Sequence, residues 1–279
     1  MIIVLSLVIG VCFASSLLEK QPKLPKTDIF EEFIVGGRNT KPNEFPYQVG
    51  FRDKGSNLGF TFCGGSIISD QWLLSAAHCF YDRTADQMSK TEVVIGTTSL
   101  QSANAVLEGL TATVHPQYHP NTSQHFDLAL VKVAGGGLIT KKGDWFTKAI
   151  KLNDEKDANT KPGSKATVSG YGTAFQQFPL SNLHMKTIDI ELQADSVCQK
   201  VYEEDYDEND LCAADPSGKT GTCFGDSGGP LVVGLGDNRI QVGVVLRGIV
   251  CAQREIPKIY ARVSSMLPWI KEVTGIKDL

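Results

Sequence analysis

Short apolar runs, separated by Gly, Asn and Asp, recur along the chain from residue 34 onward. They contain β-branched residues, which favour extended backbone, and turn residues separate them at moderate intervals. The clearest runs are residues 48–51, 72–75, 92–95, 128–133, 166–169 and 241–245. This pattern predicts an all-β domain built as a barrel or sandwich.

Only the C-terminal tail has a helical pattern. Trp269, Ile270 and Val273 fall on one helical face, and Pro268 suits a first helical turn. We therefore expect a C-terminal α-helix over about residues 266–276.

The N-terminus has a different character from the rest of the chain. Residues 1–14 are uncharged and apolar, and small residues follow at Ala14, Ser15 and Ser16. This predicts a secretory signal peptide over residues 1–16 and a secreted, extracellular protein. No other apolar run reaches about 18 residues, so we expect no membrane-spanning helix. Residues 17–33 contain two prolines and no periodicity, which predicts a flexible pro-segment.

Composition narrows the function classes. Hydrophobic residues make up 42% and charged residues 21% of the 279 residues, which is typical of a globular domain. The net charge of −4 gives no basic surface for nucleic acid.

One of the seven cysteines, Cys12, lies in the signal peptide. The other six are an even number in a secreted chain, which predicts disulfides rather than a zinc site, since no CxxC spacing occurs.

Three motifs carry candidate chemistry. They are His78 within Ser75-Ala76-Ala77-His78-Cys79, Asp127 before an apolar run, and Ser227 within Gly225-Asp226-Ser227-Gly228-Gly229-Pro230. A serine hydroxyl is a poor nucleophile unless a base takes its proton, and an imidazole with an ordinary pKa of about 6.5 suits that role. A carboxylate would hold the imidazole in one tautomer. Each motif alone is weak evidence, but the three together are specific.

The order His, Asp, Ser, together with Ile34-Val35-Gly36-Gly37, resembles the chymotrypsin/trypsin family of serine peptidases over residues 34–279. The resemblance implies an all-β, chymotrypsin-like fold of two six-stranded antiparallel β-barrels with a C-terminal α-helix. The barrels would span about residues 34–152 and 163–265. It also implies a monomer that acts on protein or peptide substrates and meets protein inhibitors, with no cofactor. The implied disulfides are Cys63–Cys79, Cys198–Cys212 and Cys223–Cys251.

The resemblance further implies activation by cleavage before Ile34. The new ammonium of Ile34 would pair with buried Asp226 and order the oxyanion hole, made by the N–H groups of Gly225 and Ser227. Two features depart from the family pattern. The residue before the cut is Phe33, so a trypsin-type activator should not release Ile34. The pro-segment also contains no cysteine that could tether it after cleavage.

The specificity pocket departs further. The resemblance places Gly221, Thr222, Gly248 and Lys258 there, and Gly221 stands where trypsins carry Asp, so cleavage after Arg or Lys is not expected. Leu246 and Arg247 replace the family's Ser-Trp, and Val250 replaces a glycine at the pocket mouth. Lys258 replaces another glycine, and a buried ammonium without a partner is costly.

Three interpretations of Lys258 stay open. It recognises an acidic substrate side chain, similar to granzyme B, which has a basic residue at the matching place. It plugs the pocket. In the third interpretation, the Lys258 ammonium extends out of the pocket toward solvent and leaves room for small or medium apolar residues. Two function classes follow: an activated serine endopeptidase, and a weak or inactive homologue that acts as a binding or decoy protein.

Remaining motifs are weaker. Asn121-Thr122-Ser123 is an N-glycosylation sequon. The acidic run 203–210 is most simply a solvated loop, with a cation site or basic partner as the alternative. Thr97 follows Gly96 where many trypsins carry a calcium-binding Glu, so no metal is predicted. His115, His119, His125 and His184 lack a catalytic context and are predicted to be surface or loop residues.

Overall fold

β-Strands dominate the part of the chain that the computed structural model describes, which is residues 37–56, 60–103, 105–121, 125–142, 144–154, 159–172, 183–218, 220–222, 225–247 and 256–279. The strands are β1 (Arg38–Asn39), β2 (Gln48–Asp53), β3 (Cys63–Ile67), β4 (Trp72–Ser75), β5 (Thr91–Ile95), β6 (Ala105–Leu107), β7 (Leu110–Val114), β8 (Ala129–Val133), β9 (Lys141–Lys142), β10 (Trp145–Phe146), β11 (Lys151–Leu152), β12 (Lys165–Gly170), β13 (Lys186–Leu192), β14 (Asp210–Ala214), β15 (Pro230–Val233), β16 (Ile240–Arg247) and β17 (Lys258–Arg262).

Short helices connect these strands. The α-helices are α1 (Ala85–Ser89), α2 (Asp195–Tyr202) and α3 (Val263–Thr274), and the 3-10 helices are η1 (Ala77–Cys79), η2 (Leu100–Ser102), η3 (Glu203–Asp205) and η4 (Gly236–Asn238). None of the helices in the described ranges is both long enough and apolar enough to cross a membrane. The expectation that only the tail is helical was wrong, because α1 and α2 are also present. α1 is too short to give a helical period, and local capping defines it: Thr84 and Gln87 form a reciprocal capping box.

The second half of the chain forms a closed barrel. Its strand order is β13-β12-β15-β16-β17-β14, and β14 pairs back with β13, so six antiparallel strands close the ring. β1 adds to the outer side of β13, and β11 pairs parallel with β16. The fold-class prediction of a six-stranded barrel is confirmed for this half.

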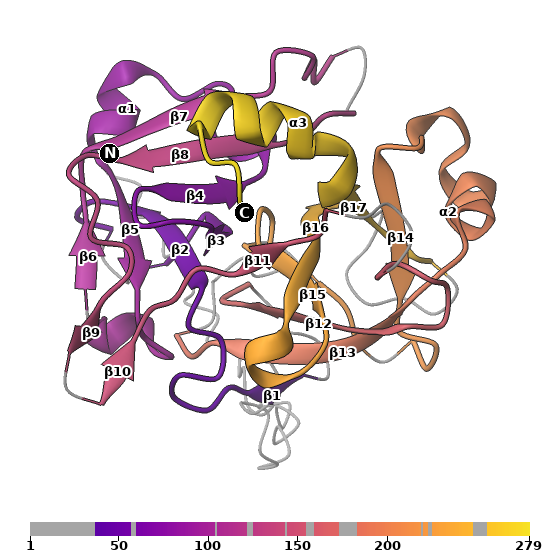
Figure 1. Cartoon of the computed structure of the whole chain (residues 1–279), viewed down its shortest axis with the longest axis horizontal. Helices are drawn as coiled ribbons and strands as arrows, with labels where there is room; N and C mark the ends of the chain where they lie inside the picture. The colour runs from indigo at the N-terminus through magenta and orange to yellow at the C-terminus, as the bar shows by residue number, and fades with distance from the viewer. Residues whose placement is uncertain are drawn as a thin grey trace, which may run out of the picture. The chain divides into compact units, whose positions relative to one another are not determined.

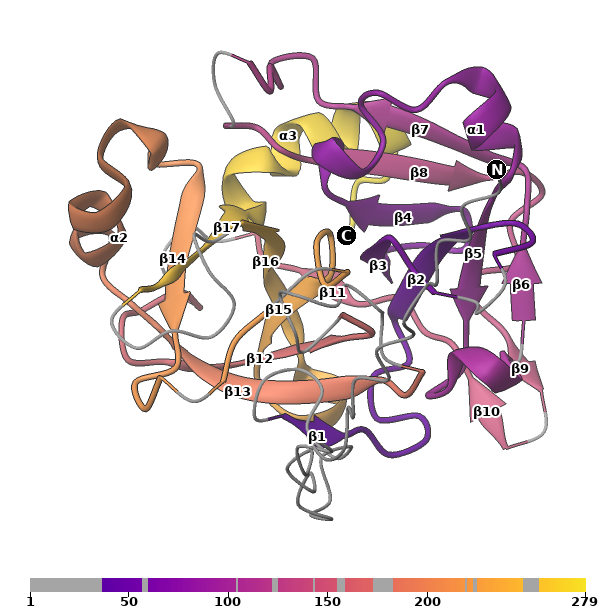
Figure 2. The ribbon, with the colours of Figure 1, turned by 180° about the vertical axis from the view of Figure 1, so that it is seen from behind.

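The first half is a seven-stranded antiparallel sheet in the order β6-β5-β2-β3-β4-β8-β7, and it is an open half-barrel by its strand pairing. Its two edge strands, β6 and β7, follow each other in the chain and are separated only by Glu108 and Gly109. Gly109 has a φ of 72°, which interrupts the extended backbone there. The expected sixth strand is therefore divided in two. Figures 1 and 2 show this sheet and the closed barrel side by side.

Burial explains why these segments are strands. β5 is rich in β-branched residues and is buried at every position. β8 is buried except at Lys132, which faces outward. The six apolar runs singled out in the sequence lie in β2, β4, β5, β8, β12 and β16, apart from Leu128, which directly precedes β8.

Two buried hydrogen bonds join the halves. Ser66 of β3 donates to Gln241 of β16, with 2.6 Å between Oγ and Oε1. Ser169 of β12 donates to Gln48 of β2, with 2.7 Å between Oγ and Oε1. Each bond has one partner in the first sheet and one in the second, so both fix the relative position of the barrels.

The C-terminal helix expected for the fold is α3, which begins one turn earlier than the periodicity suggested. It starts at Val263, so Pro268 lies in its interior rather than its first turn. It ends where Gly275 adopts the left-handed conformation, with φ of 72°, a common helix stop. α3 follows β17 of the second barrel and extends toward β7 and β8 of the first (Figure 1).

Candidate active site

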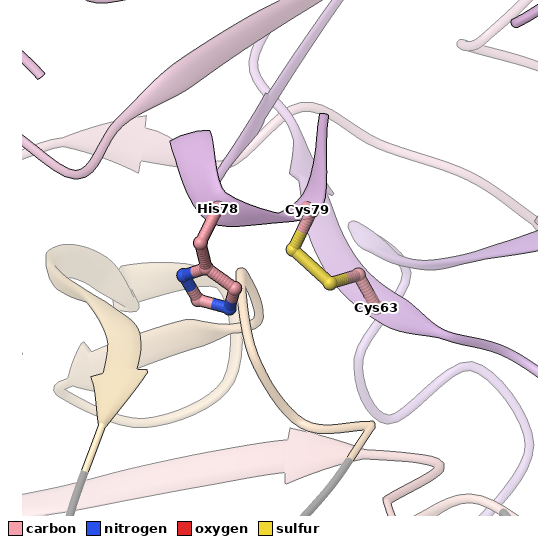
Figure 3. Close-up of side chains that lie close together, drawn as sticks. All are labelled: Cys63, His78 and Cys79. Carbon is pink, nitrogen blue, oxygen red and sulfur yellow. A yellow bond between two sulfur atoms is a disulfide. The ribbon is translucent and has the colours of Figure 1, made fainter. Parts of the chain in front are cut away.

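His78 lies on the short helix η1, directly after β4. The Cys63–Cys79 disulfide ties this helix to β3. Figure 3 shows the imidazole of His78 and the disulfide projecting from the same turn. Cys63, His78 and Cys79 have the composition of a metal cluster, but both sulfur atoms are used in the disulfide and therefore cannot act as thiolate ligands. The side chain of His78 is 33% exposed, so it faces solvent while its backbone is fixed.

Asp127 holds His78 through two hydrogen bonds. The Nδ1 atom of His78 lies 2.7 Å from Oδ2 of Asp127, and the backbone N–H of His78 donates to Oδ1 at 2.8 Å. A carboxylate only accepts hydrogen bonds, so this arrangement puts the imidazole proton on Nδ1. The other ring nitrogen, Nε2, is then the basic atom of the pair. The side chain of Asp127 is 5% exposed.

The turn that presents Asp127 has an unusual backbone. Phe126 has a φ of 58°, a region that non-glycine residues rarely occupy. Its ring stacks on His115, with centroids 4.9 Å apart, and His115 also packs against Trp269 of α3 at 4.7 Å. Burial lowers the pKa of His115, which favours the neutral ring in this apolar stack. His115 is a loop residue, as the expectation of a surface or loop position allowed, but it is buried, with 6% exposed.

Ser227 meets the same region from the second barrel. The backbone N–H of Gly64 in β3 donates to the carbonyl oxygen of Ser227 at 2.8 Å. Gly228 makes this approach possible, because a Cβ atom there would lie 2.2 Å from Oγ of Ser75. Gly225, the other predicted oxyanion residue, has a φ of 90°, which favours glycine. The chain thus brings the Ser227 turn against the elements that carry His78.

Asp226 points into the second barrel. It is fully buried, and its Oδ1 accepts a hydrogen bond from the N–H of Gly172 at 2.9 Å. A Cβ atom on Gly170 or Gly172 would lie 2.3 Å from atoms of the Asp226 carboxylate. Glycine at both positions therefore makes room for the Asp226 carboxylate. Ile34 lies outside the described residues.

The predicted pocket residues Gly221 and Lys258 line one small cavity. Its volume is about 10 Å³, roughly the room that one water needs. Lys258 is 7% exposed, and burial lowers the pKa of its ammonium to about 8. Thr222 is also buried, whereas Gly248 and Val250 lie outside the described residues.

Asp215 also lines this cavity, and sequence reasoning missed it. Hydrogen bonds from Ser217 and Thr220 outweigh the opposing effect of burial and lower the pKa of Asp215 to about 2. Asp215 therefore supplies a carboxylate at this cavity, although Gly221 stands where trypsins carry Asp. A signal existed in the sequence, because Asp215 begins an Asp-Pro-Ser-Gly turn between Cys212 and Gly221.

Other predicted residues are placed as follows. The Cys198–Cys212 disulfide is present and joins α2 to β14. Cys223 and Cys251 lie outside the described residues. Asn121 is exposed, and the remainder of its sequon lies outside the described part of the chain.

Comparisons with known proteins agree with this arrangement. A family model described as Trypsin matches residues 34–270. Serine protease 28 of Mus musculus is 35% identical over 251 residues, covering 86% of this chain and 88% of the relative. Trypsin 5G1 of Aedes aegypti is 33% identical over 245 residues, covering 87% and 85% respectively.

A solved structure of neuropsin, a serine protease expressed in the limbic system of mouse brain, superimposes with a TM-score of 0.73 and 26% identity. The superposition covers 86% of this chain and all of that one. The chain therefore belongs to the trypsin family, has the chymotrypsin-like fold, and is a serine endopeptidase.

Proposed function

We propose that this endopeptidase works through His78, Asp127 and Ser227. The observation that carries the proposal is the contact of 2.7 Å between Nδ1 of His78 and Oδ2 of Asp127. This contact leaves Nε2 as the base, and the Gly64 hydrogen bond holds the Ser227 turn next to the His78 helix. These contacts support a triad drawn from loops of both barrels.

The proposed reaction is acyl transfer through a covalent intermediate. Ser227 Oγ attacks the peptide carbonyl while Nε2 of His78 takes the hydroxyl proton. The N–H groups of Gly225 and Ser227 stabilise the oxyanion that forms. His78 then gives the proton to the leaving amine, and water hydrolyses the acyl-enzyme by the same steps. The Asp127 carboxylate stabilises the imidazolium that forms.

Activation is proposed to follow cleavage before Ile34. Asp226 is a fully buried carboxylate beside Ser227, and such a charge is stabilised by a cationic partner and by hydrogen bonds. The new ammonium of Ile34 supplies the cation. Because Phe33 precedes the cut, an activator that cleaves after large apolar residues fits better than a trypsin. The chain is proposed to be secreted as a zymogen and to act as a monomer on protein substrates, under control of protein inhibitors.

The proposed substrate preference is for acidic side chains. Lys258 is 93% covered by protein, which argues against the ammonium snorkelling to solvent. With a pKa of about 8 it is mostly protonated at pH 7. A substrate Asp or Glu that reached it would form a charge-assisted hydrogen bond in a site shielded from water.

A second candidate function rests on the size of the same cavity. A volume of about 10 Å³ does not accommodate a substrate side chain unless Lys258 or its neighbours move. If they do not move, the chain is a blocked homologue that binds substrates without cutting them.

Two measurements on chain cut at an engineered site before Ile34 separate these functions. A fluorophosphonate reagent labels Ser227 when the hydroxyl, its base and the oxyanion hole all function. This labelling does not depend on the specificity pocket. Labelling that Ser227→Ala abolishes supports the triad. Absence of labelling in correctly folded, cleaved chain contradicts it.

A peptide library then tests the pocket, with Lys258→Met compared with Lys165→Met, an exposed lysine on β12 of the same barrel. Cleavage after Asp or Glu that moves to apolar residues only in Lys258→Met supports acidic specificity. Activity that first appears in Lys258→Met identifies a plugged pocket.

A further inference from the structure

His125 and two carboxylates of the second barrel form a compact cluster that the proposed reaction does not use. His125 lies in the loop that leads to Asp127. Asp207 follows η3, and Asp210 is the first residue of β14. The three ligand atoms lie within 4.8 Å of one another. The sequence favoured a solvated loop for the acidic run 203–210 and left a cation site or a basic partner as the alternative, because it gives no hint that a histidine from the other barrel faces the run.

The distances within this cluster fit a shared metal ion. Nδ1 of His125 lies 3.4 Å from Oδ2 of Asp207 and 3.5 Å from Oδ2 of Asp210. Both separations are longer than the direct hydrogen-bond range of about 2.7–3.2 Å. Two ligands of a tetrahedral Zn²⁺, each about 2.0–2.2 Å from the ion, lie about 3.3–3.5 Å apart. The nitrogen thus stands at ligand spacing from both carboxylates.

Burial makes a cation at this place favourable. The side chain of Asp210 is 2% exposed and that of His125 is 17% exposed. The carboxylates of Asp207 and Asp210 lie close together and repel each other, the more so because Asp210 is shielded from water, and a divalent cation between them removes this repulsion. Asp207 is 32% exposed, which leaves an open side from which an ion can enter.

Neighbouring groups orient the most exposed ligand. The N–H of Asn209 donates to Oδ1 of Asp207 at 2.7 Å, and Nδ2 of Asn209 donates to Oδ2 at 3.2 Å. Such outer contacts fix a ligand carboxylate before the metal arrives. Asp207 is therefore largely preorganised.

We propose that His125, Asp207 and Asp210 form a divalent transition-metal site that links the two barrels beside Asp127. One imidazole and two carboxylates, with a fourth position open, match zinc-type coordination. Ca²⁺ fits poorly, since it takes six to eight oxygen ligands. Because His125 is two residues from Asp127, the bound ion ties the catalytic aspartate's loop to the second barrel.

The competing explanation is a plain ion pair. A protonated His125 would also be attracted to Asp207 and Asp210, without any metal. The two explanations differ in what they need: the ion pair needs a proton and gains strength on acidification, whereas the metal site needs zinc and a neutral imidazole.

Zinc titration of the whole chain, after stripping with EDTA and dialysis, tests the site. The probe is Zn²⁺ alone, followed by calorimetry at pH 7.5 with the parent, His125→Gln and Asp207→Asn. The matched control is His119→Gln, an exposed histidine earlier in the same connection between β7 and β8. A zinc ion bound at His78 would be counted equally in all four proteins. The difference between proteins therefore isolates this cluster.

The expected result is one more tightly bound zinc per chain in the parent and in His119→Gln than in the two cluster variants, or a loss of affinity of at least about tenfold. Zinc should also raise the melting temperature of the parent more than that of either variant. Equal zinc stoichiometry, affinity and thermal shift in all four proteins would overturn the proposal. So would a stabilisation on acidification that depends on His125, persists in EDTA and occurs without zinc uptake.

Discussion

The imidazole ring of His115 lies nearly parallel to the phenyl ring of Phe126, with 4.9 Å between centroids and 14° between planes. Phe126 directly precedes Asp127 and has a φ of 58°, a conformation that costs a non-glycine residue on the order of 1–3 kcal/mol. The stack, together with the contact between His115 and Trp269, offsets that cost. We therefore interpret His115, which contacts both Phe126 and Trp269 of the C-terminal helix, as a residue that positions Asp127.

Replacing His115 with Ala should affect both stability and catalysis. Loss of a buried ring should lower the free energy of unfolding by about 1–3 kcal/mol. A less constrained Asp127 should also lower kcat and shift the acidic limb of the pH profile of kcat/KM, which reports the protonation of His78. His119→Ala, on the same loop but exposed, should change neither. If His115→Ala unfolds more easily yet keeps its kcat and pH profile, its role is packing alone.

Burial of Lys258 should reduce stability at neutral pH. The pKa of the ammonium falls from 10.5 to about 8, so the unfolded chain binds more protons than the folded one between these values. Above pH 10.5 the Lys258 amine is neutral in both states, so its burial carries no charge penalty. The free energy of unfolding then decreases as the pH falls from 10.5 through about 8, where the folded chain must bury the ammonium. Lys258→Met should therefore be more stable than the parent at pH 7, by about 3 kcal/mol at most.

Thermal unfolding of the parent, Lys258→Met and Lys165→Met from pH 7 to pH 10.5 tests this. The stability advantage of Lys258→Met should shrink as the pH rises, while Lys165→Met should follow the parent throughout. An advantage that does not depend on pH would mean that apolar packing, rather than the charge, causes the difference.

The strand pattern predicted an all-β barrel or sandwich because strands are local signals, and the two-barrel arrangement was implied by the resemblance that the catalytic motifs carry. Runs of β-branched residues indicate strands whatever they pair with, and Ser227 and His78 each sit in a distinctive short motif. The division of one strand at Gly109 was not predictable, since a single glycine does not reveal that the segments before and after it pair with different strands, β5 and β8. Contacts between distant segments were also missed. His115 meets Trp269, and His125 meets Asp207, only after both barrels have formed.

Gly172 should be essential for the position of Asp226. A Cβ atom there would lie 2.3–2.4 Å from the carboxylate carbon and oxygens. Since Asp226 directly precedes Ser227, Gly172→Ala should displace the oxyanion N–H groups and lower kcat by about 10²–10³-fold, the effect of losing one such donor. Active-site titration together with kcat on a peptide substrate measures this.

Gly163→Ala is the comparison for this variant. Gly163 has a φ of 82° but open space around its Cβ direction, so alanine there strains only the backbone. It should lose about 1 kcal/mol of stability and keep its kcat. Equal kcat in Gly172→Ala and the parent would show that Asp226 can move without disturbing the site.

The hydrogen bonds Ser66–Gln241 and Ser169–Gln48 should each contribute to holding the barrels together. All four residues are at most 2% exposed, so removing a serine hydroxyl takes a donor from a glutamine oxygen that water reaches poorly. Ser66→Ala and Ser169→Ala should each cost about 1–3 kcal/mol in urea unfolding. Exposed Ser102→Ala should cost far less. Because each bond constrains the same interface, the double variant should lose less than the sum of the two. A strictly additive loss would mean that the bonds stabilise their own strands independently, and that the barrels are held by their apolar contacts instead.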